Sequence, residues 1–302
     1  MNKEISIVVP HYNSVSKLLR LLSTIPEDER IEVIVVDDNS NITENQKELL
    51  IKHIKEKGIL LDNSTGKRGA GVCRNIGIDH AMGKWILFAD ADDYFMPEAF
   101  DTFMENVDDK ADIIFFDMTS INETDGSISD RHLGYSRLVN NYLKHDDDLC
   151  DLDIRANWSS PTTKMIQKSL IEQLAIRFDE SIVANDVMFS LRAGMNAKTI
   201  KAVAKTTYCV TKDENTLTTI RNHDRTCVRF KKYWEKYNYL DKRIGRTRLN
   251  TLGMGIFQFL LYALRSKYLL MGIKIVHDNQ TNTCASINWF GWLKNHYRVR
   301  RI

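Results

Sequence analysis

Short apolar runs alternate with amphipathic segments over the first ninety residues of the chain. The runs are rich in β-branched and aromatic residues, as expected for buried parallel strands. They lie at residues 5–9, 31–36, 59–61 and 85–89. Segments with helical spacing of apolar residues lie between them, at residues 17–25, 43–57 and 72–81. Strand–helix alternation with short connections predicts an α/β fold, a mostly parallel sheet with helices on both faces.

Polar residues follow each predicted strand, and the carboxyl ends of parallel strands meet at one edge of a sheet. After the strand at 85–89, three carboxylates occur within four residues: Asp90, Asp92 and Asp93. Carboxylates at such an edge can hold a hard divalent cation, which can in turn hold a diphosphate. Taken alone, a solvated acidic turn with an aspartate as helix cap explains them equally well.

Other side chains predicted at this edge also suit a nucleotide. Tyr12 can stack on a flat base, and Asp38 can accept a hydrogen bond from a ring N–H or a ribose hydroxyl. Lys67 and Arg68 stand in a glycine-rich loop before a helix, where cations and free amides attract phosphate. The alternatives are a turn aromatic, a helix cap and a solvated loop, respectively.

Composition sets outer bounds on the function. The 302 residues are enough for one large domain or two coupled ones, and the net charge of +2 is close to neutral. The five cysteines lie far apart without metal-ligand spacing, which predicts free thiols in a reducing compartment. The N-terminus has no segment of signal-peptide type, and the longest mainly apolar stretch, residues 252–264, is too short to span a bilayer. We therefore expect a cytoplasmic protein.

Four linked motifs resemble those of the family 2 glycosyltransferases. They are Ile-Val-Val-Pro-His-Tyr-Asn at 7–13, Val-Val-Asp-Asp-Asn-Ser at 35–40, Arg-Asn-Ile-Gly at 74–77 and Phe-Ala-Asp-Ala-Asp-Asp at 88–93. The resemblance covers about the first hundred residues, and four motifs in order are far more specific than one acidic triplet. Members of this family are inverting, metal-dependent enzymes with the GT-A fold that use nucleotide sugars.

The resemblance implies roles for individual residues. Asp90 would touch the ribose, Asp92 would ligate Mn²⁺ or Mg²⁺, Asp38 would read the base and Tyr12 would stack on it. The nucleotide-sugar-binding set predicted here is Pro10, Tyr12, Asp38, Lys67, Arg68 and Asp90.

A later part of the chain is similar to the acceptor half of many family members, where a Trp-rich loop and a lysine precede a Glu-Asp pair whose second acid is the base. Here the pair is Asn185-Asp186, so Asp186 is the predicted catalytic base, with a helix-capping acid as the alternative. Asn185 can hydrogen-bond but carries no charge, which puts the role of the first position in doubt. Trp158, Lys164 and Asn185 are the predicted acceptor-binding residues, although Trp158 is equally well explained as a core aromatic.

The remaining segments carry weaker signals. Strands are expected at 111–118 and 206–210, a helix at 169–176 and a solvated acidic loop at 145–153. Residues 212–219 resemble the flexible loop that covers the donor in related enzymes, and His223 is expected at the surface.

The last third of the chain is basic. Arginines and lysines between residues 221 and 248 are interleaved with aromatic residues at helical spacing, and no acid follows Asp278. Such a pattern suits the anionic face of a bilayer, or a helical lid whose aromatic residues pack on the catalytic domain. No motif supports binding to nucleic acid.

Together these observations predict a metal-dependent inverting glycosyltransferase that moves a sugar from a nucleotide diphosphate sugar, most simply a UDP-sugar, to a glycan or lipid-linked acceptor in surface polysaccharide synthesis. We expect a nucleotide-sugar-binding half at 1–100, an acceptor-binding half at 101–212 and a helical extension at 213–302 that touches the cytoplasmic face of the inner membrane. The rival functions are a nucleotidyltransferase and a non-catalytic sugar-nucleotide or glycan-binding module.

Overall fold

A computed structural model of the chain describes residues 2–55, 57–213 and 223–265. Most of the predicted flexible loop at 212–219, the basic tail and Cys284 lie outside these residues. The chain divides into two compact units, Met1–Val228 and Arg229–Ile302. The division falls within a long helix, and each unit is described by itself.

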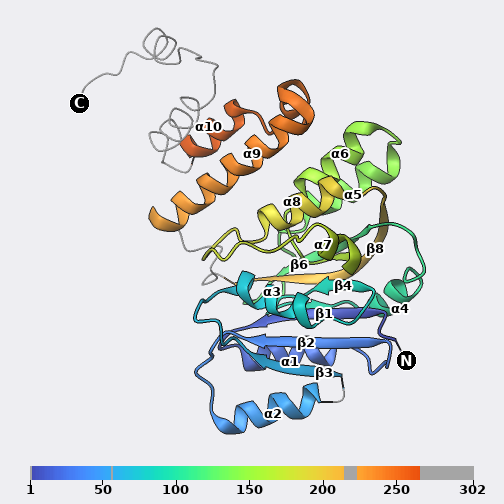
Figure 1. Cartoon of the computed structure of the whole chain (residues 1–302), viewed down its shortest axis with the longest axis vertical. Helices are drawn as coiled ribbons and strands as arrows, with labels where there is room; N and C mark the ends of the chain where they lie inside the picture. Colours follow the sequence, from blue (N-terminus) through green and yellow to red (C-terminus); the bar gives the residue numbers. More distant parts are fainter. Residues whose placement is uncertain (1, 56, 214–222, 266–302) are drawn as a thin grey trace. The chain divides into compact units, whose positions relative to one another are not determined.

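The first unit is built on one sheet of eight strands in the order β3-β2-β1-β4-β7-β6-β8-β5 (Figure 1). The strands are β1 (Ile5–His11), β2 (Ile31–Asp37), β3 (Gly58–Asp62), β4 (Trp85–Phe88), β5 (Tyr94–Phe95), β6 (Ile113–Asn122), β7 (Lys164–Gln167) and β8 (Ile200–Lys212). The strands β1 to β4 are parallel, and β7 is inserted antiparallel between β4 and β6. The predicted α/β fold with a mostly parallel sheet is confirmed.

Helices cover both faces of the sheet. The helices of the first unit are α1 (Val15–Ser23), α2 (Glu44–Ile54), α3 (Ala70–His80), α4 (Ala99–Met104), α5 (Leu133–Lys144), α6 (Asp148–Asn157), α7 (Lys168–Gln173) and α8 (Val187–Asn196). Side chains on successive positions of a strand point to opposite faces, and the core follows this rule. Ile7 and Val9 of β1 pack in the layer with α1, α2 and α4, whereas Val8 packs in the layer with α3 and α5 to α8.

The helix α1 forms because its apolar residues recur at helical spacing. Leu18, Leu21 and Leu22 are buried on one face, each contributing about 1.5–3 kcal/mol. Ser14 and the exposed Tyr12 lie in the short turn between β1 and this helix, so the packing of α1 fixes where the turn stands.

The long helix α9 (His223–Thr251) is kinked at Gly245 and is followed by α10 (Ile256–Arg265). In the second unit, Phe230 and Trp234 of α9 pack on Phe259 of α10, with ring centroids 5.7 and 5.8 Å apart. The aromatic residues predicted at helical spacing in α9 therefore form the core between two helices. His223 is exposed, as expected.

The acidic segment at 145–153 differs from its prediction as a solvated loop. Asp147 accepts hydrogen bonds from the backbone N–H groups of Leu149 and Cys150 and so caps α6, while Leu152 and Ile154 of that helix are buried. Asp147 is thus the N-cap residue, and Asp148 and Asp151 are first-turn acids, which the helix dipole favours.

Candidate active site

The strand order turns at β1, which lies between β2 and β4, and ligands of open α/β sheets bind at the carboxyl ends of strands at such a point. The two strand ends here are locked together. His11 Nδ1 lies 2.7 Å from Asp37 Oδ1, and Ser40 donates to the same carboxylate through its backbone N–H and its hydroxyl. Pro10 is half-buried within β1, and Tyr12 follows with 54% of its surface exposed, free to meet a planar group.

Asp38 shapes the loop that follows β3. Its Oδ1 accepts a hydrogen bond of 2.7 Å from Asn63 Nδ2, and its Oδ2 accepts one of 2.8 Å from the backbone N–H of Gly69. Gly69 has φ +115°, a backbone conformation that L side chains rarely adopt. Asp38 is itself buried, at 8% exposed, so its two oxygens are mainly engaged in holding this loop, and its base-reading role stays a prediction.

The two basic residues of this loop are exposed. Lys67 Nζ lies 2.5 Å from Glu180 Oε2, and Arg68 stands beside it in the sequence. An exposed ion pair contributes about 0–1 kcal/mol, so a phosphate group can replace Glu180 as the partner of Lys67 at little cost.

Arg74 joins the predicted donor site to the segment that carries the predicted base. Its guanidinium is almost completely buried, donates to Asp90 Oδ1 at 2.5 Å and to Asn185 Oδ1 at 3.0 Å, and lies over the ring of Phe178. The start of α3 packs tightly on the same segment: a Cβ on Gly71 would lie 2.2 Å from the carbonyl oxygen of Asp179. Asp90 and Asn185, which are 95 positions apart, therefore meet on one cation.

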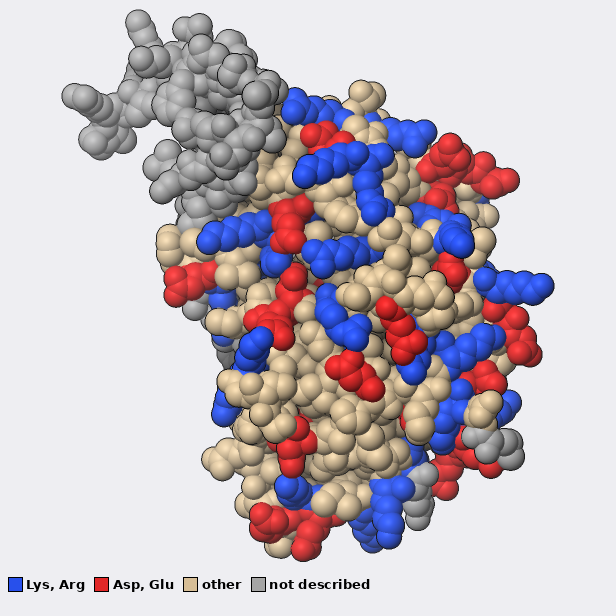
Figure 2. All heavy atoms as spheres, viewed as in Figure 1, with Lys and Arg blue, Asp and Glu red and all other residues tan. Residues whose placement is uncertain are grey.

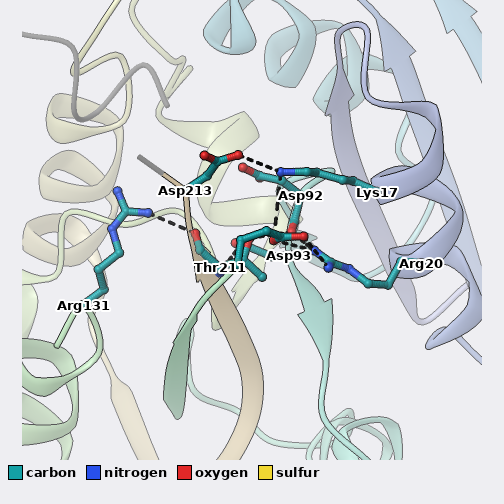
Figure 3. A network of polar contacts seen from close by, with 8 residues as sticks. Lys17, Arg20, Asp92, Asp93, Arg131, Thr211 and Asp213 are labelled. Atoms are coloured by element: carbon teal, nitrogen blue, oxygen red, sulfur yellow. Dashed lines mark hydrogen bonds and ion pairs between the residues drawn. The ribbon is translucent and has the colours of Figure 1, made fainter. Parts of the chain in front are cut away.

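The turn that carries Asp92 and Asp93 is held by its backbone (Figure 3). The carbonyl oxygen of Asp92 accepts hydrogen bonds from Arg20 and from Thr211 Oγ1, and the Asp93 carboxylate accepts one of 2.8 Å from the backbone N–H of Thr211. Asp93 is buried, and burial together with the Asp92 and Asp90 carboxylates raises its pKa well above the usual range. Asp93 thus anchors the turn to β8 and is no free ligand.

Asp92 is the half-buried acid of this turn. Burial and the neighbouring Asp90 carboxylate raise the pKa of Asp92, and the charge of Lys17, which pairs with Asp213 Oδ2 at 3.2 Å, opposes the shift (Figure 3). Crowded, partly desolvated carboxylate oxygens are a donor set that fits a hard cation such as Mn²⁺ or Mg²⁺. Among the described residues no three potential ligand side chains are grouped to enclose a metal, and Asp92 is the side chain predicted to hold such an ion.

Asp186 is the N-cap residue of α8, yet its side chain makes no capping hydrogen bond. Burial raises the pKa of this carboxyl group, and the positive charge of Arg74 opposes the shift most strongly, with Lys164 acting in the same direction. A carboxylate that is not consumed by capping and that titrates above its usual range suits a general base.

Two predicted acceptor-binding residues are placed differently from the expectation. Trp158 and Lys164 are 1% and 2% exposed, so neither offers surface to a ligand. The indole of Trp158 packs between Phe115 and Tyr135, with ring centroids 5.1 and 4.9 Å away, which makes it a core aromatic. The prediction that these two side chains contact the acceptor is therefore corrected.

Several residues of the site carry no isolated signal in the sequence. Asn63 donates a hydrogen bond to the carboxylate of Asp38, and Thr211 donates one to that of Asp93. The hydroxyl of Tyr208 accepts a hydrogen bond of 2.9 Å from the backbone N–H of Asp90. Asn63 follows β3 directly, as Asp38 follows β2, so its position at a strand end was the available clue. Thr211 and Tyr208 come from β8, more than a hundred positions away, and no local pattern points to them.

Helices within the described ranges, residues 2–55, 57–213 and 223–265, include none that is long and apolar enough to cross a membrane. On the face drawn in Figure 2, basic and acidic side chains alternate over the described residues instead of forming a region of one sign.

Two curated relatives are similar to about two thirds of the chain. The poly(ribitol-phosphate) β-N-acetylglucosaminyltransferase TarS of Staphylococcus aureus is 26% identical over 217 residues, which cover 69% of this chain and 36% of TarS. The poly(ribitol-phosphate) β-glucosyltransferase of Bacillus spizizenii is 30% identical over 214 residues, covering 68% of this chain and 32% of that enzyme. The chain thus spans about a third of the length of these relatives.

Solved structures agree on the fold. Residues 1–349 of S. aureus TarS in complex with UDP-GlcNAc align with a TM-score of 0.61 at 19% identity, covering 92% of each chain. A likeness at this identity supports the GT-A fold and carries no residue roles.

The profile described as glycosyl transferase family 2 matches residues 6–175, which is more than half of the chain. This stretch contains all four motifs and the strand ends at which Tyr12, Asp38 and Asp90 stand. The chain belongs to glycosyl transferase family 2.

Proposed function

We propose that the chain is a metal-dependent inverting glycosyltransferase that transfers a sugar from a UDP-sugar to a glycan or lipid-linked acceptor in the synthesis of a cell-surface polymer. The observation that carries the proposal is the Arg74 guanidinium, which binds Asp90 on the donor side and Asn185 beside Asp186. The names of the two relatives, an N-acetylglucosaminyl- and a glucosyltransferase, support a hexose or N-acetylhexosamine as the sugar.

The donor would lie across the strand ends, with its base on Tyr12 and Asp38, its ribose at Asp90 and its diphosphate towards Lys67 and Arg68. Mn²⁺ or Mg²⁺ held by Asp92 would supply charge neutralisation for the departing diphosphate. We assign residues 1–100 to this donor half and residues 101–212 to the acceptor half.

Asp186 would take the proton from an acceptor hydroxyl as the oxygen attacks the anomeric carbon. The new glycosidic C–O bond forms while the bond from that carbon to the diphosphate oxygen breaks on the opposite side, and the bonding electrons leave with the nucleoside diphosphate. One displacement inverts the anomeric configuration. Asn185 leaves the Arg74 charge to be balanced by Asp90, because an amide oxygen accepts the hydrogen bond without contributing a charge.

A donor screen tests this function. Purified protein is heated with UDP-, GDP- and dTDP-sugars, each with and without Mn²⁺, and donor hydrolysis is measured in parallel. A UDP-sugar at a hundred times its Kd should raise Tm by about 5 °C in the presence of Mn²⁺, with slow hydrolysis of the same donor.

The rivals predict other outcomes in the same screen. A shift with UDP-sugars but no hydrolysis or transfer favours a binding module, and the absence of glycine-rich basic sequence after β1 already argues against a nucleotidyltransferase. No shift with any nucleotide sugar would contradict the proposal.

We further propose contact between α9 and the anionic cytoplasmic face of the inner membrane. Nine basic and three acidic residues lie in α9, and its aromatic face is already used for packing on α10, so the attraction would be mainly electrostatic. The protein should sediment with vesicles containing phosphatidylglycerol at 50 mM salt and be released at 0.5 M salt, because screening removes such attraction. Binding that is equal on neutral vesicles would contradict this contact.

A further inference from the structure

A buried lysine contacts the helix that begins at the predicted base. Lys164, the first residue of β7, is 2% exposed, and its Nζ donates a hydrogen bond of 3.0 Å to Ser190 Oγ. Ser190 is itself held, because its hydroxyl donates to the carbonyl oxygen of Ser159 at 2.8 Å. Burying an ammonium group is costly, so a lysine in this position calls for a reason beyond packing.

Ser190 and Asp186 lie on the same face of α8, one helical turn apart. The backbone N–H of Ser190 donates to the carbonyl oxygen of Asp186 at 2.9 Å, the i to i−4 bond of a helix. The ammonium group of Lys164, which reaches Ser190 from β7, therefore lies against the same face of α8 as Asp186, the residue at which this helix begins. Ser190 uses one of the three N–H bonds of Lys164.

The charges of the two groups act on each other. Burial lowers the pKa of Lys164 to about 7, and the charge of Asp186 opposes that shift. Around Asp186 the other facing groups are Arg74 from α3, Asp90 from the end of β4 and Tyr135 from α5. The charge of Arg74 lowers the pKa of Asp186 more than that of Lys164 does, but Arg74 also holds Asp90 at 2.5 Å, whereas Asp186 is the acid that acts on Lys164.

We propose that Lys164 is a positioning residue for Asp186: its buried ammonium, held by Ser190, keeps the carboxylate of Asp186 ionised so that it can take a proton. This inference rests on the proposed function, since it assigns Lys164 a task in the same proton transfer. This role is compatible with the burial of Lys164, whereas direct contact with the acceptor is not.

The signature of this role is its dependence on pH. Without the ammonium, the pKa of Asp186 should rise, because an opposite charge that lowers it is removed. The acidic limb of the kcat/KM profile then moves to higher pH, and kcat/KM below that limb falls about tenfold for each pH unit by which the limb moves. Above pH 8 the wild-type lysine has itself lost its proton, so wild type and variant should converge.

Three variants separate charge from packing. Lys164→Met removes both the charge and the hydrogen bond, Lys164→Gln keeps a donor for Ser190 without charge, and Lys164→Arg keeps the charge. Lys57→Met is the matched control, because Lys57 is a half-buried lysine whose Nζ bonds two backbone carbonyl oxygens, of Leu22 and Ile25, at the opposite end of the sheet. Both neutral Lys164 variants should shift the acidic limb, and Lys57→Met should not.

A readout independent of transfer keeps this test apart from that of the proposed function. The carboxyl ¹³C resonance of Asp186, assigned with Asp186→Asn, is titrated by NMR in protein labelled at aspartate. A higher pKa in Lys164→Met and Lys164→Gln, restored towards wild type in Lys164→Arg, supports the proposal even if no sugar is transferred. An unchanged Asp186 titration, or Lys164→Gln behaving as wild type, would overturn it.

Stability supplies a second measurement. Because the folded pKa of Lys164 is about 7 and the unfolded value about 10.4, the unfolded chain binds more protons between these limits. Wild type should therefore gain stability relative to Lys164→Met as pH rises from 7 to 10, and Lys164→Met should be the more stable of the two at pH 6. A constant difference in Tm across this range would show that folding does not lower the pKa of Lys164, and would overturn the proposal, which requires a desolvated interaction with Asp186.

Discussion

Replacing Asp186 with asparagine is expected to lower turnover by a factor of a hundred or more while donor binding stays nearly intact. Asparagine has almost the same shape but cannot accept the proton of the acceptor hydroxyl, and general-base catalysis contributes about 10²–10⁴ to a rate. The helix start should survive, because the Asp186 side chain makes no capping hydrogen bond that the change would remove.

The measurement is the pair of kcat and donor Kd in the presence of Mn²⁺. Glu172→Gln is a suitable control, since it neutralises a carboxylate of α7 that forms an i,i+4 ion pair with Lys168. Donor affinity that falls as steeply as turnover would mean that Asp186 belongs to the donor site and that the base lies elsewhere.

The sequence was most informative about polar residues that directly follow a strand. Strand boundaries follow from apolar runs such as residues 5–9 and 31–36, and the carboxyl edge of a parallel sheet follows from their order. The placement of Tyr12, Asp38 and Asp90 along one edge could therefore be anticipated before any coordinates.

Contacts between distant segments were the part that could not be anticipated. Arg74 stood in a recognised motif, but its bridge from Asp90 to Asn185 depends on how α3 packs on the 179–185 segment. The burial of Lys164 was missed for a similar reason: a lysine that opens a short strand is typical of a solvent edge, and only the insertion of β7 between β4 and β6 covers it.

The acidic segment at 145–153 was predicted to be a solvated loop from its charge, although an aspartate can also cap a helix. One aspartate before a helix is favourable, and the apolar residues that order α6 come later, at Leu152 and Ile154. A window that extended a further turn would have contained the helical signal.

Replacing Asp92 with alanine is expected to abolish metal-dependent turnover without unfolding the protein. The turn is held by hydrogen bonds that Arg20 and Thr211 donate to the backbone carbonyl oxygen of Asp92, and by the carboxylate of Asp93. The side chain of Asp92 is therefore not needed to hold the turn. Its removal also relieves the desolvation of that carboxylate and its repulsion from Asp90, which together raise the pKa of Asp92. The variant should therefore keep the Tm of the metal-free wild type, or exceed it, while Mn²⁺ no longer raises the affinity for a UDP-sugar.

Asp93→Ala provides the contrasting variant, because it removes the acceptor of a buried backbone N–H of Thr211 and should cost about 1–3 kcal/mol of stability. Mn²⁺ binding followed by electron paramagnetic resonance, together with Tm, separates the two positions: Asp92→Ala loses the bound-ion signal in the presence of UDP at unchanged Tm, and Asp93→Ala loses Tm. Mn²⁺ binding by Asp92→Ala that is as tight as in wild type would contradict the assignment of Asp92 as the metal ligand. The buried Asp93 would then be the ligand instead.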